Sequence, residues 1–124
     1  MSIEAGRKAE IPLVVTEADT ATAFRSGDVP VLATPRVAAL MEEAAVAAVA
    51  SGVDDGFTTV GTHLRVDHLA PSYVGAEVVA SARVIRTEGR RIEFFVQLME
   101  GDVVAARGDH LRVLVDREQF VGGG

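Results

Sequence analysis

Two ionisable side chains of this sequence are predicted to lie among apolar residues, and ionisable groups in such places can transfer protons. The first is Glu42. On a helical wheel its neighbours are Ala38, Ala39, Ala45 and Val46. A carboxylate among such residues either reaches solvent at a rim or is buried with a partner. Buried carboxylates often mark active sites, because burial raises the pKa of a carboxyl group toward neutral pH. Glu42 is therefore either a tolerated rim charge or a general base.

The second is His68, which strand-like alternation places on one apolar face with Leu64 and Val66. A lone histidine on such a face is commonly a core residue with a satisfied hydrogen bond. A histidine and a carboxylate that converge across a helix–sheet interface would instead form a general-base pair. The sequence thus makes Glu42 and His68 candidates for proton transfer.

Thr34 is a third candidate, because it precedes Pro35 at the predicted start of a helix. As a structural residue it would be the N-cap of that helix. A hydroxyl beside free N–H groups at a helix N-terminus can also stabilise a developing oxyanion. The two interpretations are compatible.

The remaining polar residues give weaker signals. His63 lies on the opposite face from His68, and His110 sits in the last predicted strand, so both are interpreted as ordinary polar positions. No metal-site spacing, nucleotide-binding glycine motif or Gly-x-Ser-x-Gly motif is present. Cysteine is absent, which excludes disulfides and thiol nucleophiles.

Three arginines surround a predicted hairpin, namely Arg86, Arg90 and Arg91. Such a cluster is usually a solvated turn. In an acidic protein it is also a candidate docking point for phosphates.

The element that must position Thr34 and Glu42 is a helix predicted over residues 34–50. Pro35 favours its start and Ser51-Gly52 its end. Apolar residues lie nearly all around it, which predicts burial on most sides.

Period-2 alternation predicts strands over 58–69, 76–87, 91–99 and 103–116, preceded by a β-rich segment at 10–16. In the 58–69 strand one face is predicted to hold Val60, Thr62, Leu64, Val66 and His68, and the other Gly61, His63, Arg65, Asp67 and Leu69. Residues 17–33 are predicted as loop with a helical turn at 21–24, and a bulge is expected near Gly108. Tight connections imply antiparallel neighbours, so we expect an α+β fold whose sheet curls around the helix.

Composition limits the class of protein. The chain has 124 residues, 48% of them hydrophobic, and a net charge of −6. We expect one domain over residues 1–124, with its core at about 8–120 and a glycine-rich, frayed tail at 121–124. The acidic balance argues against nucleic-acid binding. The sequence shows neither a secretory signal nor an apolar run that could cross a membrane, so a cytoplasmic protein is expected.

The mean hydropathy of +0.25 is high for a small monomer and predicts a subunit interface.

Taken in order, several stretches resemble the hotdog-fold acyl-CoA thioesterases, within them the fluoroacetyl-CoA thioesterase-like group. These stretches are Ala33-Thr34-Pro35, Leu40-Met41-Glu42, Val60-Gly61-Thr62, Val66-Asp67-His68, Glu88-Gly89-Arg90-Arg91 and His110. The resemblance covers residues 31–120. It implies a long central helix wrapped by a curved five-stranded antiparallel sheet, and a homodimer with the active site at its interface. A further pairing of dimers is left open.

The resemblance also assigns roles. It implies Thr34, Glu42 and His68 as catalytic residues, Gly61 beside the reacting group, and Arg90 and Arg91 as contacts for coenzyme A phosphates. No cofactor is implied beyond the coenzyme A of the substrate. Whether Glu42 attacks the thioester or activates water is left open.

One departure limits the substrate. The loop before Thr34 offers only Phe24 where the fluoroacetyl-selective member is expected to have an aromatic lid. We therefore expect a different short- or medium-chain acyl thioester, of coenzyme A or of a carrier protein. Two alternatives are a non-catalytic dimer that binds an acyl-CoA or another apolar ligand, and a hotdog enoyl hydratase or dehydratase. The second usually has Asp or Asn five residues before the histidine, where this chain has His63.

Overall fold

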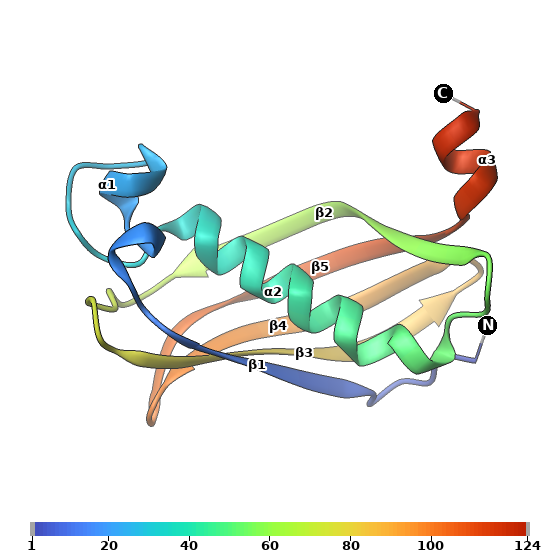
Figure 1. Ribbon diagram of the computed structural model, residues 1–124. Helices are drawn as coiled ribbons and strands as arrows, with labels where there is room; N and C mark the ends of the chain where they lie inside the picture. Colours follow the sequence, from blue (N-terminus) through green and yellow to red (C-terminus); the bar gives the residue numbers. More distant parts are fainter. Residues whose placement is uncertain (1, 124) are drawn as a thin grey trace.

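The computed structural model describes residues 2–123, in which one long helix lies across a five-stranded sheet (Figure 1). The strands are β1 (Lys8–Val14), β2 (Phe57–His68), β3 (Glu77–Glu88), β4 (Arg91–Glu100) and β5 (Val103–Asp116). They are ordered β1-β3-β4-β5-β2, and every neighbouring pair is antiparallel. The long helix is α2 (Thr34–Val49). The predicted arrangement of helix and curved sheet is confirmed, while Met1 and Gly124, the ends of the predicted domain, lie outside the described residues.

Short elements join these parts: η1 (Glu17–Asp19), α1 (Ala21–Phe24), η2 (Ala50–Gly52) and α3 (Arg117–Gly122). The helical turn predicted at residues 21–24 is confirmed as α1. The prediction of a frayed tail from residue 121 is wrong for Val121 and Gly122, which belong to α3. Asp116 caps α3 by accepting a hydrogen bond from the Gln119 N–H, and α3 includes Val121 and Gly122.

Helix α2 buries one face against the sheet and leaves the other exposed. The buried face consists of Val37, Leu40, Met41, Ala44, Ala45, Ala48 and Val49. Val46 on the other side is 45% exposed, and Glu43 beside it is also exposed. The prediction of burial on most sides is therefore wrong for a single chain, because the sheet covers only one side of the helix (Figure 1).

The central strands carry the core face that their alternation predicts. Its members on β3 and β4 are Val78, Ala80, Ala82, Val84, Ile92, Phe94, Val96 and Leu98, and all are buried. Removing this apolar surface from water is the main stabilising contribution to the fold.

A bulge in β2 changes the predicted pattern. In β2 the register shifts between Gly61 and His63, so Thr62 is an extra residue. A one-residue insertion exchanges the faces of the residues on one side of it. Leu64, Val66 and His68 keep the predicted inner face, but Gly61 now faces inward too.

The bulge expected near Gly108 lies instead at Ala105 of the same strand. The register of β5 stays continuous at Gly108 and shifts instead between the partners of Leu98 and Met99, which leaves Ala105 unpaired with β4. Gly108 has another reason to be glycine. A Cβ at this position would collide with the backbone carbonyl of Arg65 on β2.

Within residues 2–123 no helix combines the length and apolarity needed to cross a bilayer.

A buried carboxylate fastens the segment before α2 to the start of that helix. Asp19 accepts hydrogen bonds from the Arg36 Nε at 2.9 Å and the Thr16 N–H at 2.8 Å. Its backbone carbonyl accepts from the Ala33 N–H at 2.9 Å. Burial alone would raise the pKa of Asp19, but the hydrogen bonds from Thr16 and Arg36 outweigh it and hold that pKa below its usual value.

We predict that Asp19→Asn lowers the free energy of unfolding at pH 7 by about 1–3 kcal/mol. Because the folded pKa is lowered, the stabilisation is complete above the unfolded pKa of about 3.9 and is lost as pH falls through the folded value. Urea unfolding from pH 7 to pH 3 measures this, with exposed Glu17→Gln from the same turn as control. An Asp19→Asn variant as stable as wild type at pH 7 would contradict the prediction.

Candidate active site

The start of α2 leaves the Thr34 hydroxyl available for chemistry. Ala33, not Thr34, occupies the N-cap position, and it has no side chain to cap the helix. The sequence-based interpretation of Thr34 as an N-cap is therefore wrong. Its Oγ1 lies 2.8 Å from the Nδ1 of His68, so the hydroxyl and the imidazole form a hydrogen-bonded pair.

His68 is the last residue of β2 and brings its imidazole from the sheet to the start of the helix. The Nε2 atom is buried and has no hydrogen-bond partner in the described part of the chain. Burial lowers the pKa of His68, because the charged imidazolium is poorly solvated there. The ring is therefore neutral near pH 7 and able to accept a proton from a hydroxyl or a water molecule.

This pair lies in the wall of an apolar cleft of about 310 Å³. The cleft is lined by Ala21, Ser26, Val31, Leu32, Thr34, His68, Leu69, Ala70 and Pro71. Its walls come from the segment before α2 and from the chain after β2. Most of the lining residues are apolar, so an apolar chain can lie beside the Thr34–His68 pair.

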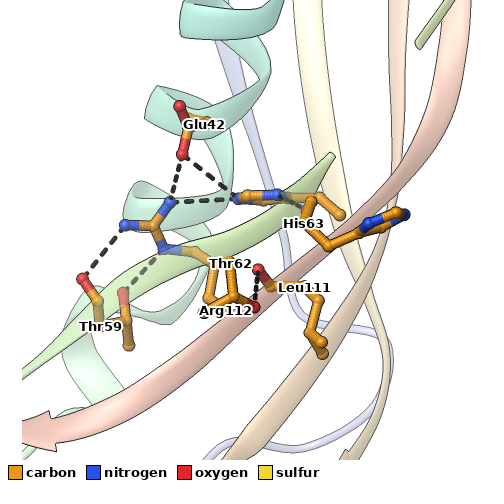
Figure 2. A network of polar contacts seen from close by, with 7 residues as sticks. Glu42, Thr59, Thr62, His63, Leu111 and Arg112 are labelled. Atoms are coloured by element: carbon orange, nitrogen blue, oxygen red, sulfur yellow. Dashed lines mark hydrogen bonds and ion pairs between the residues drawn. The ribbon is translucent and has the colours of Figure 1, made fainter. Parts of the chain in front are cut away.

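Glu42 does not contact His68 within the chain. Eight residues of α-helix separate Thr34 from Glu42, which is about 12 Å along the axis. Figure 2 shows the Glu42 carboxylate directed at Arg112 of β5. Its Oε2 lies 3.1 Å from the Arg112 Nη1 and 3.8 Å from the Nε2 of His110. The expected Glu42–His68 pair is thus not formed inside one protomer.

Arg112 is buried, and its guanidinium is held from three directions. Nε donates to the Thr59 Oγ1 at 2.9 Å and Nη2 to the Thr59 carbonyl at 3.1 Å. Nη1 approaches both the Glu42 carboxylate and the His110 Nε2 at 3.1 Å. A buried guanidinium with such partners orients the carboxylate that it faces.

Gly61 lies directly against this cluster. A Cβ on Gly61 would collide with the Glu42 carboxylate and would lie 3.1 Å from the Arg112 Nη1. The resemblance implies Gly61 beside the reacting group, whereas alternation alone predicts it on the outer face of β2; the structure places it against Glu42. The bulge at Thr62 explains the difference.

Sequence reasoning missed the burial of His110 and the participation of Arg112. His110 is only 2% exposed, although it was interpreted as an ordinary polar position. Period 2 along β5 carried the signal, since Ala106, His110 and Leu114 share the buried face with Arg112.

The structure places Arg90 and Arg91 at the β3–β4 hairpin, far along the sheet from His68. Arg91 pairs with Val113, and the Leu114 N–H donates to the Arg90 carbonyl. Both arginines are exposed, and the Arg90 guanidinium lies 6.0 Å from the ring centre of Phe57. They therefore lie at the Arg112 end of the sheet. Contacts with phosphates stay a prediction.

No group of three or more histidine, aspartate or glutamate side chains suited to a metal ion occurs among residues 2–123.

Comparisons with known proteins agree on one family. The model of the fluoroacetyl-CoA-specific thioesterase family matches residues 15–118. The fluoroacetyl-CoA thioesterase of Streptantibioticus cattleyicolor is 33% identical over 90 residues, which are 73% of this chain. The matched region spans 65% of that relative's length.

Solved structures extend the agreement to the fold. The fluoroacetyl-CoA thioesterase FlK superposes with a TM-score of 0.92 at 26% identity, covering 99% of this chain and 96% of that one. A thioesterase-superfamily protein of Thermus thermophilus gives a TM-score of 0.91 at 27% identity, covering 98% and 90%. The chain therefore has the hotdog fold and belongs to the fluoroacetyl-CoA-specific thioesterase family.

Proposed function

We propose that this protein hydrolyses a short- or medium-chain acyl thioester of coenzyme A to the free acid and the thiol, without a cofactor. The observation that carries the proposal is the Thr34–His68 pair in the wall of an apolar cleft. An acyl chain would occupy the cleft, with its thioester carbonyl beside Thr34. The names of the relatives support thioester hydrolysis as the reaction.

In the proposed reaction an oxygen nucleophile adds to the carbonyl carbon and the C–S bond breaks. Neutral His68 accepts the proton of the attacking water or hydroxyl and returns it to the leaving thiolate. Proton transfer of this kind contributes about 10²–10⁴-fold to the rate. Backbone N–H groups at the start of α2 and the Thr34 hydroxyl stabilise the oxyanion, each donor contributing about 10²–10³-fold. Glu42 either helps His68 to activate that water or attacks the carbonyl carbon itself. In the second case the thiolate leaves and takes a proton from solvent, and a water molecule that gives its proton to His68 hydrolyses the acyl anhydride formed on Glu42.

The acyl group is proposed to be larger than fluoroacetyl. The cleft lining contains no phenylalanine, tyrosine or tryptophan, and Phe24 of α1 is not part of that lining. An open apolar cleft favours an uncharged hydrocarbon chain over a single polar substituent. Fluoroacetyl specificity belongs to the named relatives and is not proposed here.

We further propose a homodimer in which each site takes residues from both chains. β2 is an edge strand, paired only with β5 in the described sheet, so a second copy can pair with its free edge. A two-fold axis midway between Gly61 and His68, near Leu64 and Arg65, would bring the partner's Glu42 to the Thr34–His68 pair. The Glu42 side chain is 45% exposed, which leaves it accessible to such a substrate site.

The same symmetry gives the hairpin arginines a role. Arg90 and Arg91 lie far from their own His68, at the Gly61 end of the sheet. In the proposed dimer they approach the partner's site and are the candidate contacts for coenzyme A phosphates. A dimer of dimers and a cytoplasmic location stay predictions from the sequence.

Thiol release from a panel of acyl-CoA esters tests the activity, and the absence of cysteine removes protein background from a colorimetric thiol assay. His68→Ala and Glu42→Gln are each expected to lower kcat by at least about 100-fold. Exposed Glu43→Gln, one residue along α2, is the matched control and should retain activity. Saturable binding of acyl-CoA without thiol release would instead support a non-catalytic binding dimer.

Heterodimers test the shared site directly. A heterodimer of one His68→Ala chain and one Glu42→Gln chain, purified with two tags, should show about half of wild-type activity, since symmetry leaves one site intact. A heterodimer of wild type with a chain carrying both substitutions should then be nearly inactive. If the residues act within one chain, the two results exchange, and the shared site is wrong.

A further inference from the structure

We propose that His110 is a positioning residue: its neutral imidazole accepts a hydrogen bond from Arg112 and so holds Glu42 in place, and protonation releases this arrangement. The inference rests on the proposed function in one respect, the use of Glu42 in catalysis. The arrangement itself rests on contacts around His110 that are independent of any reaction.

The partners of His110 determine where its proton lies. Nδ1 is 2.8 Å from the backbone carbonyl oxygen of His63, which can only accept a hydrogen bond, so Nδ1 carries the hydrogen. Nε2 is 3.1 Å from the Arg112 Nη1, which can only donate, so Nε2 keeps its lone pair. Both contacts are satisfied together only by the neutral ring protonated at Nδ1.

The surroundings favour this neutral form. From its own strand His110 meets the charged Arg112, from α2 it meets Glu42, and from β2 the titratable His63. From β4 the Phe94 ring lies 5.7 Å away between ring centres. His110 and Phe94 also line a second cleft, and the charged side chains in the lining of that cleft are Arg91, Glu93 and Asp109. Burial first, and then Arg112, lower the pKa of His110 against the opposing effects of the His63 carbonyl and Glu42.

Protonation would reverse the contact with Arg112. A hydrogen on Nε2 would point at a guanidinium that also donates, so the two cations would repel. The new N–H would instead turn toward the Glu42 Oε2, 3.8 Å away, and compete with Arg112 for the carboxylate. Glu42 would then lose the position set by Arg112 as the pH falls through the pKa of His110.

Two substitutions separate this role from simple packing. His110→Phe keeps an aromatic ring beside Phe94 but removes the acceptor, and it is expected to lower kcat about tenfold or more with KM changed about twofold at most. His110→Gln places an amide oxygen near the position of Nε2. Its kcat should stay within about threefold of the wild-type value. In a profile of kcat against pH, the loss of activity at low pH that results from protonation of His110 should be absent. His63→Gln keeps the backbone carbonyl and removes only an exposed ring. It is the matched control, and its kcat should still fall at low pH as in the wild type.

The closing experiment is NMR of the full chain, which has only three histidines. The ¹⁵N shifts of His110 should show the neutral Nδ1–H form at pH 7. The carboxyl ¹³C shift of Glu42 should bend at the pH where His110 titrates, and this inflection should vanish in His110→Gln, while exposed Glu43 serves as the reference. An Nε2–H or charged ring at pH 7, or a Glu42 shift without the inflection, would overturn the proposal.

The result is separable from the proposed function. If no thioester is hydrolysed but the inflection is present, His110 does position Glu42 and only the catalytic use of Glu42 fails. If thioesters are hydrolysed and His110→Phe has the same kcat and the same pH profile as the wild type, the positioning role is wrong. The proposed thioesterase activity is then still supported.

Discussion

The buried guanidinium of Arg112 is the constraint on which one half of this molecule depends. A charge removed from water is tolerated only when opposite charge and hydrogen-bond acceptors surround it. Thr59, Glu42 and His110 supply those acceptors from β2, α2 and β5. The cluster therefore ties the helix to the two strands at one edge of the sheet. It also requires Gly61, because any side chain there would displace the carboxylate.

The end of the molecule that carries Thr34 and His68 differs from the Arg112 cluster in its charge. Thr34 and His68 form a neutral pair beside an apolar cleft, and burial keeps the imidazole uncharged. One chain thus separates a charged cluster from a neutral proton acceptor by about 12 Å of helix. In the proposed dimer, two copies pair along the free edge of β2. Because antiparallel strands place opposite ends side by side, the charged cluster of one copy would lie next to the Thr34–His68 pair of the other.

The start of α2 shows how a missing cap can be useful. With alanine at the cap position, the hydroxyl of the next residue is free to bond His68 instead of the helix backbone. The position of that hydroxyl is secured from outside the helix. Asp19 binds the backbone of Ala33 on one side of Thr34 and the side chain of Arg36 on the other. The loop that lines the cleft and the residue proposed to act in it are therefore fixed by the same residue, Asp19, through its backbone carbonyl at Ala33 and its carboxylate at Arg36.

Periodicity was sufficient to predict the helix, the succession of the strands along the chain and the core faces of β3 and β4, because burial of a regular element repeats with its own geometry. It did not predict that β2 pairs with β5 at the edge of the sheet. The same reasoning placed His68 on the inner face of β2. Motifs in sequence order added the family resemblance, and with it Gly61. These are local properties, so they can be recognised before the chain is folded.

Only the tertiary structure decided which polar groups meet. An extra residue at Thr62 exchanges the faces of β2, and alternation read from residue types does not reveal where such a bulge falls. The partners of Glu42 lie about 70 positions away on β5, and their choice depends on the register of three elements at once. The alternation of β5 places His110 on the buried face, but the residue types alone do not show which groups would meet its two ring nitrogens. Pairing across a sheet is set by packing of the whole chain, and for that reason the sequence alone determined the elements but not the contacts between their polar side chains.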